Sequence, residues 1–191
     1  GATRYSFDML GEGARTNEDA VRYLAAYARA IDEVGEDAGN KGPHASNGIS
    51  VKLSALHPRY ESRQEERVMR ELYPRVLQLA EQAKKYDIGL TMDAEEADRL
   101  VMSMRLFERL ALEPSLKGWE GLGLAIQAYQ KRTRALIEHL TQLARKRGTT
   151  IQTRLVKGAY WDYETVFAAA EGWPVPVFEN KWETDANYET L

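Results

Sequence analysis

The sequence contains no cysteine, which excludes disulfides, thiolate metal sites and a cysteine nucleophile. A chain without cysteine suits a reducing compartment, so we expect a cytoplasmic protein. No apolar run reaches the roughly 20 residues that a membrane-spanning helix needs, and the first residues lack the pattern of a signal peptide. The 26 basic and 29 acidic residues are spread along the chain. The sequence therefore has no basic patch that would indicate binding to nucleic acid.

The composition that remains is typical of a globular domain. The chain has 191 residues, of which 43% are hydrophobic and 29% charged, and this length is ample for one core. It begins with Gly1 and stops at Leu191 in what reads as the start of another helix. We therefore expect residues 1–191 to be one domain that is truncated at its C-terminal end.

Short segments of alternating hydrophobicity recur, each followed by a stretch with helical spacing. This order predicts a parallel sheet wrapped by helices. The first helix should begin after Thr16 as N-cap and cover the sheet with Val21, Leu24, Ala25, Ala28 and Ile31. The predicted strands are residues 5–9, 49–53, 88–93, 122–127 and 151–156, with a sixth near 175–178.

The alternation within these strands carries the functional information, because every second side chain of a strand faces the same way. One parity is apolar and the other is polar, with small residues such as Ser6, Ser50 and Ala125 deeper in the strands. An antiparallel sheet with one face in water would alternate likewise, but the intervening helices argue against it. A β/α barrel places the polar parity inside, so that five side chains gather at the C-terminal mouth where barrel active sites lie: Asp8, Lys52, Asp93, Gln127 and Arg154. A full barrel takes about 250 residues, so the first five to six β/α units are expected here.

The stretch from residue 153 to 161 is the densest candidate site. A strand runs into Gly158, which permits close approach of the backbone to a ligand, and Tyr160 and Trp161 follow. Arg154 and Lys157 are suited to hold an anion or an electron-rich ring. The structural alternative is that the two aromatic residues only seal the top of the core.

Other chemistries find little support in the sequence. The carboxylates at residues 93–96 have no histidine near them, so no metal site is expected. His57 follows a strand and is a candidate base, although a packed loop histidine explains it as well. Neither glycine pair, at 11–13 or 121–123, completes a dinucleotide fingerprint.

Five strand-end motifs resemble the proline dehydrogenase domain of the bacterial bifunctional proline utilisation A family. They are YSFDMLGE at 5–12, SVKLSALHPRY at 50–60, LTMDAEE at 90–96, IQAYQKR at 126–132 and RLVKGAYWD at 154–162. The resemblance extends more weakly over the whole chain. It implies a (β/α)8 TIM-type barrel that binds FAD and oxidises L-proline to Δ1-pyrroline-5-carboxylate by hydride transfer to flavin N5, the first step of proline catabolism to glutamate.

The resemblance also implies roles for individual residues. Lys52 would hold the substrate carboxylate, Asp93 would organise the mouth by pairing with arginine, Tyr160 would pack on the proline ring and Glu12 would belong to a gate. Arg154 would lie near the redox-active edge of the flavin. The implied flavin contacts are Gln127, Arg154, Val156, Lys157, Gly158, Ala159, Trp161 and Lys181.

The implied partners belong to the longer parent protein: a quinone electron acceptor, a pyrroline-5-carboxylate/glutamate-semialdehyde dehydrogenase domain of the same chain, and peripheral association with the inner membrane. The family draws further arginines, a tyrosine and a histidine from a later segment, and this chain ends before them. Two alternatives therefore stay open. One is a non-catalytic barrel fragment that needs its missing half, and the other is a Schiff-base lyase or aldolase that uses Lys52 or Lys157.

Overall fold

The structure is a computed structural model that describes residues 3–9 and 13–191. Five strands form one sheet in the order β1-β2-β3-β4-β5, and each neighbouring pair is parallel. The strands are β1 (Ser6–Asp8), β2 (Gly48–Val51), β3 (Gly89–Met92), β4 (Leu122–Gln127) and β5 (Gln152–Val156). The predicted strands 5–9, 49–53, 88–93, 122–127 and 151–156 are thus confirmed to within two residues at each end.

Helices follow each strand. The α-helices are α1 (Asn17–Ala38), α2 (Leu53–Leu56), α3 (Glu65–Glu71), α4 (Tyr73–Lys85), α5 (Leu100–Ala111), α6 (Thr133–Arg147), α7 (Trp161–Glu171) and α8 (Lys181–Thr190). Short 3-10 helices lie at η1 (Ser62–Gln64), η2 (Ala97–Arg99) and η3 (Pro114–Leu116). Within the described residues, no helix is both long and apolar enough to cross a bilayer.

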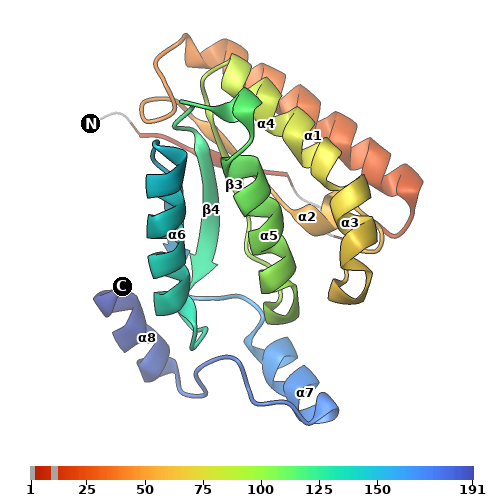
Figure 1. The fold of residues 1–191 in the computed structure, drawn as a ribbon, viewed down its shortest axis with the longest axis vertical. Helices are drawn as coiled ribbons and strands as arrows, with labels where there is room; N and C mark the ends of the chain where they lie inside the picture. The colour runs from red at the N-terminus through yellow and green to blue at the C-terminus, as the bar shows by residue number, and fades with distance from the viewer. Residues whose placement is uncertain (1–2, 10–12) are drawn as a thin grey trace.

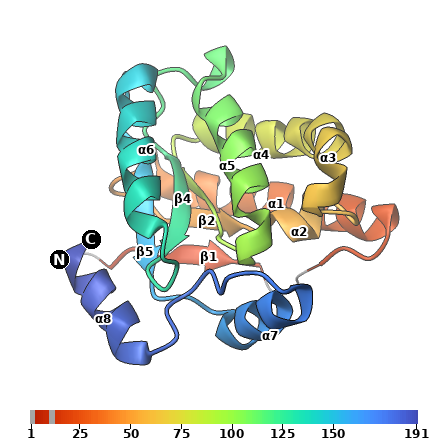
Figure 2. The same ribbon diagram turned by 60° about the horizontal axis from the view of Figure 1, so that its bottom comes forward.

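The sheet is covered by helices on one side. Crossovers between neighbouring parallel strands are almost always right-handed, so the sequential strand order places α1, α4, α5 and α6 on the same face, as Figures 1 and 2 show. Apolar side chains of the central strands, such as Ile49, Leu90 and Leu122, are fully buried beneath them. Helices α7 and α8 lie instead beyond the ends toward which the strands point (Figure 1).

The first helix begins and ends where its sequence dictates, and its predicted face is confirmed in part: Ile31 is buried and Leu24 and Ala28 pack against the core, whereas Val21 and Ala25 are exposed. Thr16 and Asp19 form a capping box, and Gly39 ends the helix in the left-handed conformation at φ 58°. Val21 is 50% exposed, whereas Tyr27 is fully buried. The Tyr27 hydroxyl accepts a hydrogen bond from the Lys52 backbone N–H at 3.2 Å, an interaction that apolar periodicity does not predict.

The predicted sixth strand is wrong. Residues 175–178 make one isolated antiparallel bridge, between Val177 and Gln130. Pro174 and Pro176 flank Val175, and proline has no N–H to donate to a strand ladder. The segment instead crosses the loop after β4, where Phe178 N donates to the Tyr129 carbonyl at 2.8 Å.

Candidate functional site

Three charged side chains meet on the inner face of the sheet, at the C-terminal ends of the strands. Lys52 directly follows β2, Asp93 directly follows β3, and Arg154 lies in β5. The ladder places Ala125 opposite Arg154 and Met92 opposite Leu124, so Asp93, Ala125 and Arg154 fall in one row across three strands. The parity of the sequence predicts this convergence, and the structure confirms it.

The Asp93 carboxylate binds both cations, each through a different oxygen. Its Oδ2 accepts a hydrogen bond from Lys52 Nζ at 2.9 Å, and its Oδ1 pairs with Arg154 Nη2. Lys52 Nζ also donates to Asp8 Oδ2 at 2.7 Å, and Arg154 Nη1 donates to Ser50 Oγ at 2.9 Å. The result is a continuous network with Arg154 at its more open end, because the Arg154 side chain is 40% exposed and that of Lys52 only 11%.

The network holds Lys52 in its charged form. Burial alone would lower the pKa of Lys52, but the hydrogen bonds and charges of Asp8 and Asp93 outweigh it and raise the pKa above its ordinary value. For the hydroxyl of Tyr27, which is neutral when protonated, burial has the opposite effect and raises the pKa to about 12. Lys52 is therefore held in its protonated form at neutral pH, with its charge balanced by the carboxylates of Asp8 and Asp93.

A second group of predicted residues surrounds a cavity of about 430 Å³ between β5 and α8. Gly158, Trp161 and Phe178 give it apolar walls, and its charged lining consists of two lysines, Lys157 and Lys181, and two carboxylates, Glu179 and Asp185. Asp185 accepts a hydrogen bond from Lys157 Nζ at 2.5 Å and another from Lys181 Nζ at 2.6 Å, and these two ammonium groups lower the pKa of Asp185. Trp161 is 44% exposed, and its Nε1 donates to the Phe178 carbonyl at 2.9 Å.

Glycine is required at residue 158 for two reasons. Its φ of +139° is a conformation that residues with a side chain rarely adopt. A Cβ atom there would also lie 2.5 Å from the ring of Tyr129, well inside van der Waals contact. The chain can thus turn from β5 into α7 close to Tyr129 only because this position has no side chain.

Gln127, at the end of β4, has a buried acceptor without a partner. Its Nε2 donates to the Glu95 carbonyl at 2.9 Å, which fixes the orientation of the amide. Its Oε1 is buried and meets no hydrogen-bond donor within residues 3–9 and 13–191. Because leaving a buried polar atom unpaired costs free energy, this oxygen indicates a ligand that brings an N–H or O–H group.

The other predicted residues have less distinctive surroundings. Tyr160 is half-buried and precedes the first turn of α7, Ala159 is exposed, and Val156 is half-buried at the end of β5. Glu12 lies outside the described residues. His57 is buried and packed, with Nε2 3.1 Å from Glu71 Oε2 and Nδ1 accepting the Arg59 N–H, which agrees with the structural reading.

Sequence reasoning missed several residues of the site: Tyr129, Asp185 and Glu164. Asp185 had a detectable signal, because it follows Lys181 by four residues and such pairs face one another on a helix. Tyr129 and Glu164 had none, since they meet only through the fold. The Tyr129 hydroxyl donates to Glu164 Oε1 at 3.3 Å.

Comparisons with known proteins identify relatives that match nearly the whole chain. The chain matches the protein family described as proline dehydrogenase over residues 1–191. It is 51% identical over 186 residues to the bifunctional protein PutA of Salmonella typhimurium, an alignment that covers 97% of this chain and 14% of that protein. It is 26% identical over 205 residues to the mitochondrial proline dehydrogenase 1 of Caenorhabditis elegans, covering 96% of this chain and 32% of that protein. The chain therefore spans about one seventh of the length of its bacterial relative.

Solved structures give the same result. A crystal structure of a mutant of Bradyrhizobium japonicum proline utilization A (PutA) superposes with a TM-score of 0.95 at 55% identity, covering 98% of this chain and 20% of that one. PutA from Bdellovibrio bacteriovorus, inactivated by N-propargylglycine, superposes with a TM-score of 0.90 at 32% identity, covering 97% of this chain and 21% of that one.

Proposed function

The chain belongs to the proline dehydrogenase family, and from this membership we propose that the protein containing it oxidises L-proline to Δ1-pyrroline-5-carboxylate with FAD as cofactor. Its fold is the α/β barrel type of that family, represented here by five β/α units. The observation that carries the proposal is the Lys52–Asp93–Arg154 network at the strand ends. It places a fixed cation for a carboxylate beside a second, more exposed cation.

The residues around the mouth fit a flavin nucleotide. The unpartnered Oε1 of Gln127 offers an acceptor to an N–H group, and the isoalloxazine ring carries one. Lys157 and Lys181 line an adjoining cavity and suit the phosphates, while the half-exposed Trp161 and the bare backbone of Gly158 suit close approach of a flat group. Val156 and Ala159 would contribute backbone and small apolar contacts. When bound, FAD would supply the two-electron acceptor that the reaction needs.

The chain's own groups would then bind and orient the substrate. Lys52, kept protonated by Asp8 and Asp93, would pair with the proline carboxylate, and Tyr160 would pack against the proline ring. Arg154 would stabilise the negative charge that the flavin gains on reduction, because a fixed cation next to developing charge needs no reorganisation. Asp93 would keep the two cations at a set separation, and Glu12 would take part in a gate over the substrate.

The Schiff-base alternative is less well supported. A lysine nucleophile must lose its proton, yet the ion pairs of Lys52 raise its pKa. Asp185 has the same effect on Lys157. Borohydride trapping of a carbonyl compound on either lysine would favour this alternative.

The rest of the reaction scheme concerns the parent protein. We propose that this protein is cytoplasmic, that it passes electrons to a quinone, and that it reaches this lipid-soluble acceptor by peripheral association with the membrane. We also propose that a glutamate-semialdehyde dehydrogenase domain of the same chain consumes the product. The bifunctional names of the bacterial relatives support the last point.

The test is anaerobic reduction of bound flavin. The full-length protein is loaded with FAD, and its visible absorption is followed as L-proline is added. Bleaching of the flavin band supports the proposal, and a flavin that stays oxidised contradicts it. The same titration on the isolated chain of residues 1–191 decides whether it is a non-catalytic fragment, since a colourless sample would support that alternative.

The role of Arg154 has its own test. In Arg154→Met the side chain keeps similar length but loses its charge, and we expect slower flavin reduction by proline. Arg154→Lys, which keeps the charge, is the matched control and should be less impaired. Equal rates for wild type and Arg154→Met would contradict the role.

A further inference from the structure

Helix α7, which begins at the end of the candidate site, has few buried side chains. Only Glu164 and Ala168 are buried in it, whereas Val166 is 69% exposed and Trp161 44% exposed. A carboxylate is an unusual group to bury at the point where a helix meets a domain. The contacts of Glu164 therefore decide where the start of α7 lies.

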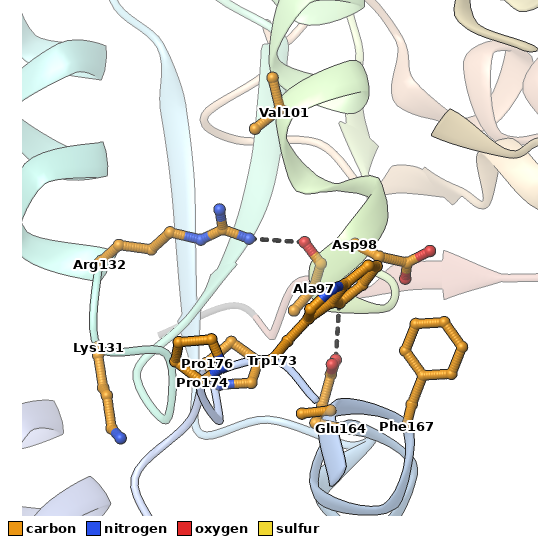
Figure 3. A pocket seen from close by; sticks show the side chains of 11 residues that line it. Ala97, Asp98, Val101, Lys131, Arg132, Glu164, Phe167, Trp173, Pro174 and Pro176 are labelled. Atoms are coloured by element: carbon orange, nitrogen blue, oxygen red, sulfur yellow. Dashed lines mark hydrogen bonds between the residues drawn. The ribbon is translucent and has the colours of Figure 1, made fainter. Parts of the chain in front are cut away.

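Glu164 and Arg132 together form a clamp on the backbone of Ala97, one on its N–H and the other on its carbonyl. The Ala97 N–H donates to Glu164 Oε1 at 2.7 Å, and the Ala97 carbonyl accepts from Arg132 Nη2 at 2.6 Å. Figure 3 shows Glu164 and Arg132 approaching Ala97 from different elements beside a cavity of about 350 Å³. The same Glu164 oxygen also accepts the Tyr129 hydroxyl.

The clamp connects three successive loops at the strand ends. Ala97 ends the loop that begins with Asp93, Arg132 lies in the loop after β4, and Glu164 lies in the first turns of α7 after β5. Trp161 begins the same helix three residues before Glu164, and Tyr160 is its N-cap residue. Tyr129 in turn packs at Gly158, so both ends of the run from Gly158 to Glu164 are fixed against the rest of the sheet.

We propose that Glu164 is a positioning residue of the flavin site, which places Tyr160 and Trp161 relative to the Asp93 loop by accepting the Ala97 N–H. The proposal rests on the proposed function, because it assigns those two side chains to the substrate and the cofactor. Glu164 acts through the backbone and through Tyr129. It does not itself touch the reacting atoms.

The contact requires an acceptor oxygen. Burial is the main cause that raises the pKa of Glu164, while the Ala97 and Tyr129 hydrogen bonds partly oppose it. A glutamine at this position keeps the length and one carbonyl oxygen, so Glu164→Gln should preserve the clamp. Glu164→Ala removes the acceptor and leaves the Ala97 N–H buried without a partner.

The experiment compares Glu164→Ala, Glu164→Gln and Glu171→Ala in the full-length protein. Glu171 ends the same helix and is exposed, so it controls for loss of a carboxylate from α7. For each variant we would measure thermal unfolding, the dissociation constant of FAD by visible titration, the absorption spectrum of the bound flavin, and KM and kcat for proline.

We expect Glu164→Ala to remain folded but to lose about 10- to 100-fold in kcat/KM, as misplaced binding groups do, with weaker FAD binding and an altered flavin spectrum. Glu164→Gln should recover most of this loss, and Glu171→Ala should match wild type. If Glu164→Ala does not fold, Glu164→Asp, which keeps the charge but is one methylene shorter, should show the same defects.

Two results would overturn the inference while the wild type stays active. One is a Glu164→Ala protein with lowered melting temperature but unchanged KM, FAD affinity and spectrum, since that is a purely structural role. The other is a folded Glu164→Asp protein indistinguishable from wild type. A wild-type protein that proline does not reduce would instead refute the proposed function, so the two failures are distinguishable.

Discussion

Asp93 and Arg154 form an ion pair across an intervening strand: Asp93 follows β3, Arg154 lies in β5, and β4 runs between them. The pair is possible because the residue of β4 in that row is Ala125, whose methyl group leaves room for the guanidinium to reach over. Since the other Asp93 oxygen binds Lys52, one carboxylate at the end of β3 sets the separation of a cation at the end of β2 and a cation in β5.

Asp93→Asn should disrupt this arrangement. The amide has one acceptor instead of two and no charge, so Lys52 and Arg154 would repel each other across it. We expect kcat/KM for proline to fall by about 100-fold through misplacement of both cations, and the free energy of unfolding to fall by roughly 2 kcal/mol. Steady-state kinetics and urea unfolding check the two effects. Asp98→Asn, at an exposed site nearby, is the control and should change neither.

Ala125→Leu tests the space between the partners. Ala125 is 8% exposed, and a larger side chain there would force Arg154 away from Asp93. We expect overpacking to cost about 1–3 kcal/mol of stability and the rate of flavin reduction by proline to drop. Ala125→Ser, which is nearly the same size, should keep both. If flavin in the Ala125→Leu protein is reduced by proline as fast as in wild type, the Asp93–Arg154 ion pair across β4 does not contribute to the reaction.

The sequence predicts the sheet well because its strands obey period two and its helices follow in strict alternation. The convergence of Lys52, Asp93 and Arg154 follows from two features of the sequence. Side-chain parity places the three residues on the same face of the sheet, and parallel strands bring their C-terminal ends to one edge. Periodicity fails where polar atoms or prolines decide the packing. Tyr27, outside the predicted face of α1, is buried and accepts the Lys52 N–H, and Pro174 and Pro176 prevent the expected sixth strand.

The wider site depends on contacts between residues far apart in sequence. Motif resemblance identifies Gly158 and Trp161, but not that Tyr129 packs at Gly158 or that Asp185 joins the two lysines. Glu164 illustrates the limit most clearly, because an acidic residue in the first turns of a helix is ordinarily explained by the helix dipole. Only the fold brings Ala97, 67 residues away, to its carboxylate.

Gly158→Ala should abolish the turn from β5 into α7. The new Cβ combines an unfavourable backbone conformation with a 2.5 Å approach to Tyr129, so we expect a loss of at least about 1–3 kcal/mol in stability and much weaker FAD binding. Gly172→Ala is a matched control, because Gly172 also has a positive φ but nothing lies within 4 Å of its Cβ position. Its loss should be limited to stability. Similar FAD dissociation constants for the two variants would contradict the steric role of Gly158.

Glu95 is a buried carboxylate whose side chain is only 6% exposed. Its Oε1 accepts the Ser54 N–H at 3.0 Å and its Oε2 lies 3.3 Å from Arg99 Nη1. Burial is the main cause that raises the pKa of Glu95 above 4.5, with Ser54 and Arg99 opposing it in part. A raised folded-state pKa means that the folded chain binds the proton more tightly than the unfolded chain. The contribution of Glu95 to stability is therefore full below pH 4.5 and declines as the pH rises through its folded pKa.

Glu95→Gln keeps an acceptor for Ser54 and cannot ionise. The free energy of unfolding of this variant, minus that of wild type, should consequently increase between pH 4.5 and neutrality. Urea unfolding across this range, followed by tryptophan fluorescence, measures the difference. Placing an amide beside Arg99 lowers the free energy of unfolding of the variant by the same amount at every pH. Only the pH-dependent change in the difference between variant and wild type therefore reports the titration of Glu95. Glu171→Gln, at an exposed site, controls for loss of a carboxylate, and parallel curves for Glu95→Gln and wild type would show that burial of Glu95 does not couple folding to pH.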